Sequence, residues 1–128
     1  RRDPTAARAA LGNELDLPAG WSIAVFPEGT RSTDGQLQAF KKGAVHLAIQ
    51  LGLPVVPVGV SADAPTLPRG PGLIRPGVVR ITVGQPLSTD EWKSDEAELR
   101  TAEVRAAASH CLERARANAA RPEPPGGP

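Results

Sequence analysis

The sequence predicts an α/β domain, and three observations lead to that prediction. Short runs rich in Val, Ile and Leu stand between glycines and prolines, which is the pattern of buried strands. Helical patterns precede, separate and follow these runs, so the order is helix, strand, loop, helix, strand, loop, strand, helix. The chain has 128 residues, of which 40% are hydrophobic and only 3% aromatic. This length corresponds to about one domain, with a core built from Val, Ile, Leu and Ala.

The first third of the chain is expected to form a helix, a strand and a loop. Asp3 and Pro4 are typical of a helix start, and apolar residues then recur every four positions. Residues 21–26 are an apolar run between a glycine and a proline, which predicts a buried strand. Residues 27–40 are rich in residue types that favour turns, so we expect a loop there.

The middle of the chain predicts a helix, a strand and a second loop. Residues 42–51 are apolar on most sides and precede Gly52, which predicts a buried helix that ends at a glycine cap. Residues 54–60 have the composition of a strand, and their two prolines favour a sheet edge, a strand end or a bulge. Residues 61–77 are rich in proline and glycine and predict an irregular loop.

The last third predicts a strand and a long helix. Residues 78–84 alternate between apolar and polar side chains, which is typical of a strand. The Ser-Thr-Asp run at residues 88–90 can cap a helix that follows it. Residues 96–119 are strongly helical in pattern, and their acidic residues come early and their basic ones late, which suits the helix dipole. Residues 121–128 are expected to be a disordered tail rich in proline and glycine.

Charge and cysteine content narrow the classes of function. The chain has 15 basic and 14 acidic residues and a net charge of +1, so no overall field favours nucleic acid, and we expect no nucleic-acid partner. Cys111 is the single cysteine, and no Cys/His spacing predicts a metal site. No apolar run in the sequence is long enough to span a bilayer.

The stretch AVFPEGTRS, at residues 24–32, places Glu28 and Arg31 just past the carboxyl end of a predicted strand. Open α/β sheets usually bind ligands at that end. The guanidinium of Arg31 offers a planar set of donors that matches phosphate, and Gly29 lets the backbone approach a ligand closely. Glu28 would repel a phosphate. Its expected task is to orient Arg31 or another cation, or to accept a hydrogen bond from a substrate hydroxyl.

Further donors stand near this stretch in the sequence. Thr30 and Ser32 add hydroxyl groups, and Lys41 and Lys42 follow about ten residues later, where a helix is expected to begin. A helix N-terminus also favours anions. These residues together predict a phosphate site, although their composition alone equally allows a surface turn with a local ion pair.

The segment Phe26–Ser32 resembles the third signature block of the glycerolipid acyltransferases, the 1-acylglycerol-3-phosphate acyltransferases and their relatives. Residues 40–44 are similar to the segment that follows it in the family, and residues 55–60 are similar to the fourth block. The resemblance covers roughly residues 1–120, which it identifies as the C-terminal part of an acyltransferase domain. It implies an incomplete three-layer α/β domain with a central β-sheet flanked by helices.

The resemblance also implies an activity. Such enzymes transfer a fatty acyl group from acyl-CoA or acyl carrier protein to lysophosphatidic acid, giving phosphatidic acid in phospholipid biosynthesis. No cofactor beyond the acyl donor is implied, and contact with the membrane is expected to be peripheral, at its cytoplasmic face. The positions that match the family's acceptor and pocket residues, together with the nearby lysines, are the predicted substrate-binding set: Glu28, Gly29, Thr30, Arg31, Ser32, Lys41, Lys42 and Pro57.

The family's catalytic block, His-x-x-x-x-Asp, does not occur in residues 1–128. His46 is followed five residues later by Leu51, and His110 by Ala115, so no catalytic residue is assigned in this chain. We therefore expect the chain to be the C-terminal portion of such an enzyme and to be inactive on its own. Two alternatives remain open: a non-catalytic phospholipid-binding module, and a sister acyltransferase with another lipid acceptor.

Overall fold

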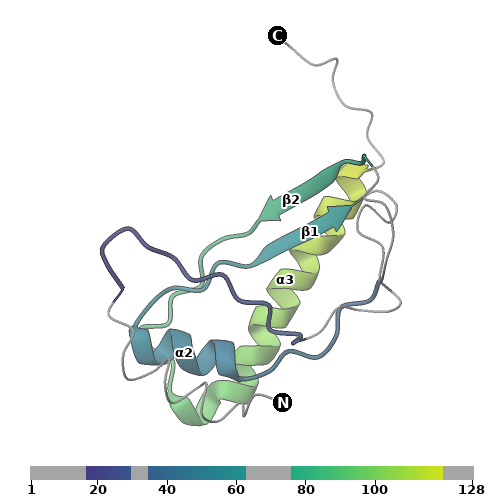
Figure 1. Ribbon diagram of the computed structural model, residues 1–128. Helices are drawn as coiled ribbons and strands as arrows, with labels where there is room; N and C mark the ends of the chain where they lie inside the picture. Colours follow the sequence, from purple (N-terminus) through teal and green to yellow (C-terminus); the bar gives the residue numbers. More distant parts are fainter. Residues whose placement is uncertain (1–16, 30–34, 63–75, 120–128) are drawn as a thin grey trace, which may run out of the picture. The chain divides into compact units, whose positions relative to one another are not determined.

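The computed structural model describes residues 17–29, 35–62 and 76–119 (Figure 1). Contacts between residues divide these ranges into two units. The first unit holds residues 17–29, 35–55 and 86–105, and the second holds residues 56–62, 76–85 and 106–119. The predicted helix after Asp3, most of the loop at residues 61–77, and the tail lie outside the described residues.

The described elements from residue 43 onward follow the predicted order of a helix, two strands and a final helix. In chain order they are α2 (Gly43–Leu51), β1 (Val58–Ala62), β2 (Val79–Val83), the short 3₁₀ helix η1 (Ser94–Glu96) and α3 (Ala97–Ala119). Among the described helices, none is both long enough and apolar enough to cross a membrane.

The first unit is built around the packing of α2 against the start of α3. Val45 of α2 is 2% exposed, and it forms a buried cluster with Ala97 and Val104 of α3. Partly buried apolar side chains surround this cluster: Phe40, Ile49, Val55, Leu87 and Trp92. The core therefore contains mainly small aliphatic side chains, as the low aromatic content requires.

Helix α2 confirms the helix that was predicted at residues 42–51, with Lys42 as its N-terminal flanking residue. Gly52 ends it with a left-handed φ of 62°, a conformation that suits glycine. The Gly52 N–H donates to the Ile49 carbonyl, and the Leu53 N–H donates to the Ala48 carbonyl. The helix is less buried than expected, because Val45 is its only fully buried residue and most others are half-buried.

The predicted strand at residues 54–60 is divided at its second proline. Val55 pairs with Leu87 through two hydrogen bonds of 2.9 and 2.7 Å in the first unit. The regular strand β1 begins only at Val58, in the second unit. Pro57 between them has no N–H to donate, which explains the interruption and confirms the expected strand-end position.

In the second unit, β1 and β2 form an antiparallel pair (Figure 1). The register places Val58 opposite Val83, and Val60 opposite Ile81. Side chains directly opposite each other share one face of a sheet, so these residues form one apolar face. That face is exposed: Val60 is 53% and Ile81 63% accessible.

The opposite face of this sheet lies against α3. A Cβ atom on Gly59 would stand 2.3 Å from the Cys111 carbonyl carbon and from the Leu112 backbone nitrogen, so only glycine permits this approach. Cys111 is 3% exposed, and its thiol donates to the Pro57 carbonyl at 3.7 Å. The strand predicted at residues 78–84 is confirmed as β2, Val79–Val83, and its apolar side chains are the exposed ones.

Two predictions about local structure are wrong. Residues 21–26 form no strand, and Trp21 and Phe26 are 69% and 87% exposed. A strand needs a neighbouring backbone to bond with, and none of the described residues pairs with this segment.

The Ser-Thr-Asp run does not cap the long helix. Thr89 instead donates its hydroxyl to the Leu53 carbonyl at 2.9 Å. The flanking residue at the helical start is Lys93, whose N–H donates to the Glu96 carboxylate at 3.3 Å, and α3 follows η1 directly.

Candidate functional site

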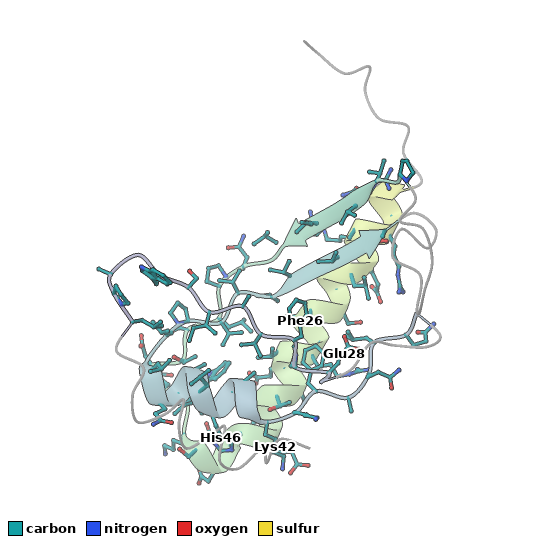
Figure 2. All side chains as sticks on the ribbon, in the orientation of Figure 1. Phe26, Glu28, Lys42 and His46 are labelled. Atoms are coloured by element: carbon teal, nitrogen blue, oxygen red, sulfur yellow. The ribbon has the colours of Figure 1, made fainter. Side chains whose placement is uncertain are left out.

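The candidate site is the loop that contains the Glu-Gly-Thr-Arg stretch. The structure describes its two sides, residues 27–29 and 35–42, whereas Thr30, Arg31 and Ser32 lie outside the described residues. Figure 2 labels Glu28 on the first side and Lys42 on the second. All described parts of this loop belong to the first unit.

A tight turn leads into the loop. The Gly29 N–H donates to the Phe26 carbonyl at 3.2 Å, which closes a four-residue turn with Pro27 at its second position. Proline is favoured there because its φ is already set for the turn. Gly29 has a φ of +72°, a left-handed conformation that side chains with a Cβ rarely adopt. The proline and the glycine of the motif are thus explained by backbone geometry.

Lys41 brings the second side of the loop onto this turn. Its N–H donates to the Pro27 carbonyl at 2.8 Å. Its ammonium end lies over Gly29, where an added Cβ would stand 2.7 Å from Nζ. The structure therefore brings together two members of the predicted set, a glycine backbone and a lysine cation. This placement confirms only their proximity, and their contact with a substrate stays a prediction.

The carboxylate of Glu28 connects the two sides of the loop by a hydrogen bond. Its Oε2 atom accepts a hydrogen bond from the Gln38 backbone N–H at 2.8 Å, and the residue is half-buried. A hydrogen bond to an ionised carboxylate is stronger than one between neutral groups. Glu28 thus ties the turn to a segment ten residues later in the sequence.

Arg105, which the sequence analysis did not single out, binds the same segment through its carbonyl groups. Arg105 of α3 donates through Nη2 to the Leu37 carbonyl at 2.8 Å and through Nε to the Gln38 carbonyl at 3.1 Å. The sequence near Arg105 does not predict this contact, because Arg105 belongs to an ordinary helical pattern and lies 67 residues after Gln38.

Three comparisons with known proteins address the family. A family model described as Acyltransferase matches residues 2–61, a range that contains every member of the predicted substrate set. The chain is 42% identical over 98 residues to a 1-acyl-sn-glycerol-3-phosphate acyltransferase of Limnanthes douglasii, covering 75% of this chain and 35% of the relative. It is 38% identical over 107 residues to the chloroplastic 1-acyl-sn-glycerol-3-phosphate acyltransferase BAT2 of Brassica napus, covering 80% and 31%.

A solved structure agrees with the sequence relatives. The 1-acyl-sn-glycerophosphate acyltransferase PlsC of Thermotoga maritima matches with a TM-score of 0.62 and 32% identity, over 73% of this chain and 39% of that one. The chain belongs to the glycerolipid acyltransferase family. This membership confirms the α/β fold class, and the two-stranded sheet with its helices is part of an acyltransferase domain. The chain spans about a third of the length of the curated relatives it matches.

Two other members of the predicted acyltransferase set occupy different surroundings. The Lys42 ammonium lies 3.3 Å from the Glu98 carboxylate, and the two side chains are 55% and 86% exposed. An ion pair this exposed contributes little stability, so Lys42 can exchange it for another anion. Pro57 is buried in the second unit, where its carbonyl also accepts from the Gly84 N–H at 2.9 Å.

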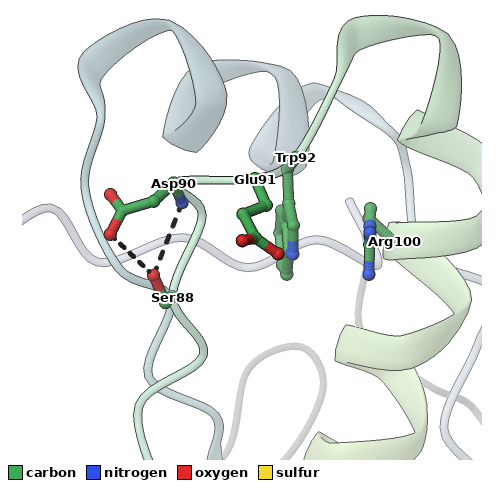
Figure 3. A pocket seen from close by; sticks show the side chains of 5 residues that line it. All are labelled: Ser88, Asp90, Glu91, Trp92 and Arg100. Atoms are coloured by element: carbon green, nitrogen blue, oxygen red, sulfur yellow. Dashed lines mark hydrogen bonds between the residues drawn. The ribbon is translucent and has the colours of Figure 1, made fainter.

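A concave surface in the first unit, away from this loop in the sequence, is a poor candidate for the acyltransferase site. It has a volume of about 250 Å³ and is lined by Ser88, Asp90, Glu91, Trp92 and Arg100 (Figure 3). Arg100 is engaged there: its guanidinium lies 5.5 Å from the Trp92 ring centre and pairs with Glu96 and Glu103 at 3.2 and 3.1 Å. The carboxylates of Asp90, which accepts a hydrogen bond from the Ser88 hydroxyl at 3.1 Å, and of Glu91 disfavour a phosphate at this surface.

The titration of this cluster follows from its contacts. The hydrogen bond to the Glu103 carboxylate, and then that to Glu96, raise the pKa of Arg100. The hydrogen bond from the Lys93 backbone, and then that from Arg100, lower the pKa of Glu96 below its ordinary value of 4.5. Both groups belong to the start of α3 and its preceding turn, outside the candidate site.

Proposed function

We propose that this chain carries the acceptor-binding part of an enzyme that transfers a fatty acyl group to lysophosphatidic acid, giving phosphatidic acid. The observation that carries the proposal is the turn at Glu28 and Gly29, over which the Lys41 ammonium lies. This turn stands in the range matched by the acyltransferase family model.

The turn has the chemistry that a phosphate monoester needs. The Lys41 ammonium supplies a positive charge beside a glycine whose missing side chain leaves the backbone accessible. Arg31 follows two residues after Gly29 in the sequence and adds a guanidinium, whose planar donors match phosphate oxygens. Thr30 and Ser32 add hydroxyl donors on either side of it. The Glu28 carboxylate, anchored on the Gln38 N–H, holds the turn in place.

Acyl transfer also needs a base that removes the proton from the acceptor hydroxyl as this attacks the acyl thioester. Neither His46 nor His110 has an aspartate five residues after it, so we assign the base to neither. This chain by itself is therefore expected to bind acceptor weakly and to form no phosphatidic acid.

The acyl donor and the membrane complete the proposal. The donor is acyl-CoA or acyl carrier protein, whose thioester is the activated form that the transfer requires. The acceptor is a membrane lipid, so the chain is expected to work at the cytoplasmic face of a membrane as a peripheral protein.

A chimera tests the activity directly. The segment of the Thermotoga maritima acyltransferase that aligns with this chain would be replaced by the corresponding segment of this chain. With lysophosphatidic acid and an acyl donor, we expect the folded chimera to form phosphatidic acid, and the same chimera with Arg31→Ala to lose nearly all of that activity. A folded chimera that forms no product, or whose activity does not need Arg31, would contradict the proposal.

A further inference from the structure

We propose that Arg105 is a positioning residue for the acceptor-binding turn and acts on Glu28 through a single peptide group. This inference rests on the proposed function for its effect on lipid binding, but the positioning itself can be measured without any lipid. Arg105 lies outside the range matched by the family model and outside every motif in the sequence analysis.

The peptide group that links Arg105 to Glu28 is the one between Leu37 and Gln38. Its carbonyl accepts a hydrogen bond from Arg105 Nη2 at 2.8 Å. Its N–H donates to Glu28 Oε2, also at 2.8 Å. A trans peptide is planar, with its C=O and N–H pointing in opposite directions, so the two side chains hold it from opposite sides.

The charges on the two sides reinforce each other. A cation lies at the negative end of the peptide dipole, and an anion lies at its positive end. Hydrogen bonds in such a chain polarise one another, so each becomes stronger when the other is present. Glu28 is therefore held more firmly than by one N–H alone.

A second hydrogen bond fixes the orientation of the guanidinium. Arg105 Nε donates to the Gln38 carbonyl at 3.1 Å, so the planar group contacts two consecutive carbonyls. Lysine reproduces this poorly, because its ammonium carries rotatable donors on a flexible stem and lacks the planar fork of the guanidinium. The side chain of Arg105 is exposed, which makes its replacement compatible with folding.

The first readout is hydrogen exchange at the Gln38 amide, followed by NMR in the whole chain. In Arg105→Lys, we expect this amide to exchange about threefold to tenfold faster, the change that corresponds to weakening one hydrogen bond. Arg114→Lys is the matched control, since Arg114 is an exposed arginine of the same helix for which no hydrogen bond with a described residue is found.

A double-mutant comparison of Arg105 and Glu28 shows whether Arg105 acts on the Glu28 hydrogen bond or only on the carbonyls that it contacts. Glu28→Gln should also speed exchange at Gln38, and Arg105→Lys should then add less than it does alone. Arg105→Gln, which is shorter and uncharged, should speed exchange at least as much as Arg105→Lys and serves if the lysine variant fails to fold. An unchanged Gln38 amide in the Arg105 variants, or fully additive effects, would overturn the inference.

The second readout is the affinity of the whole chain for lysophosphatidic acid in mixed detergent micelles. We expect Arg105→Lys to weaken binding about threefold to tenfold and Arg114→Lys to leave it unchanged. If the unchanged chain binds and Arg105→Lys binds equally well, the inference is overturned. If the unchanged chain does not bind, the proposed function fails instead, and the amide measurement alone decides the role of Arg105.

Discussion

The loop at residues 35–42 and the sheet of β1 and β2 are fixed by different kinds of contact. Glu28, ten residues before Gln38, and Arg105, 67 residues after it, hold the loop through hydrogen bonds to its backbone. The sheet is fixed by close packing of Gly59 on the backbone of α3. Hydrogen bonds are directional and fix the orientation of a polar group, so the loop is the region suited to orient a ligand.

The two regions also expose different surfaces. The loop presents the Lys41 cation above a glycine backbone, and the sheet presents an uncharged face that includes Val60 and Ile81. A change that tests the loop should therefore alter lipid binding more than stability. A change that tests the packing of the sheet should do the reverse.

The largest effect on stability is expected from Gly59→Ala. The added methyl group would stand 2.3 Å from the backbone of Cys111 and Leu112. To relieve this clash, the backbone of β1 or of α3 would have to move. Overpacking of this severity costs roughly 3 kcal/mol of the free energy of unfolding. Chemical denaturation measures it. Gly43→Ala is the control, because a Cβ there meets no atom within 4 Å, and it should be neutral or stabilising.

Gly29→Ala should have the next largest effect, mainly on the loop. Alanine at a φ of +72° costs about 1–2 kcal/mol, and its Cβ would displace the end of the Lys41 side chain. We expect a modest fall in stability, and lysophosphatidic acid binding reduced by a larger factor than stability alone explains. Titration calorimetry beside thermal unfolding separates the two. Normal binding in a folded variant would show that the turn does not hold the acceptor.

Ile81→Thr should change the unfolding free energy by less than about 0.5 kcal/mol, since this side chain is 63% exposed and loses little burial. Threonine keeps the strand propensity of a β-branched residue. The expected gain is in solubility, because the exposed apolar face becomes smaller. Measuring the concentration at which each protein begins to scatter light tests this, and a strongly destabilised variant would mean that the face is covered.

The smallest effect is expected at Glu96, where the pKa is lowered in the folded chain. A lowered pKa of a carboxyl contributes stability that is present above its ordinary value of 4.5 and is lost as pH falls through the lowered value. Glu96→Gln should therefore be slightly less stable than the unchanged chain at neutral pH, with the difference vanishing in acid. Denaturation curves across that pH range measure it, and a difference independent of pH would rule out the charge as its cause.

Local features of the chain were predictable from sequence because local physics determines them. Helix α2 ends at Gly52 as expected, since a left-handed cap is a property of glycine itself. The Pro57 interruption of the strand follows equally from one missing N–H. The turn at residues 26–29 belongs to the same class, because Pro27 and Gly29 each fit their own backbone position.

The burial of the sheet could not be predicted in this way. Alternation showed that Val79, Ile81 and Val83 share a face, but not which element would cover it. Gly59 decided the outcome, because its missing side chain lets α3 pack on the other face. Residues 21–26 show the same limit, since their apolar pattern cannot supply a neighbouring strand.

The candidate site also has one part that the local sequence predicts and one part that depends on a contact between residues far apart in the sequence. Glu28 and Gly29 were identified from a short motif, and Lys41 from its spacing. Arg105 was missed because its contact with Gln38 spans 67 residues and depends on how α3 is placed beside the loop within the first unit. Contacts of that kind are visible only in three dimensions.

The most direct test of the central claim compares two lipids that differ only in the phosphate. The affinity of the chain for lysophosphatidic acid and for the monoacylglycerol with the same acyl group would be measured in mixed micelles, with the unchanged chain and with Arg31→Ala. The account predicts at least about a tenfold preference for the phosphate lipid, lost in Arg31→Ala, as expected for charged hydrogen bonds to phosphate. Equal affinity for both lipids in the unchanged chain would contradict it.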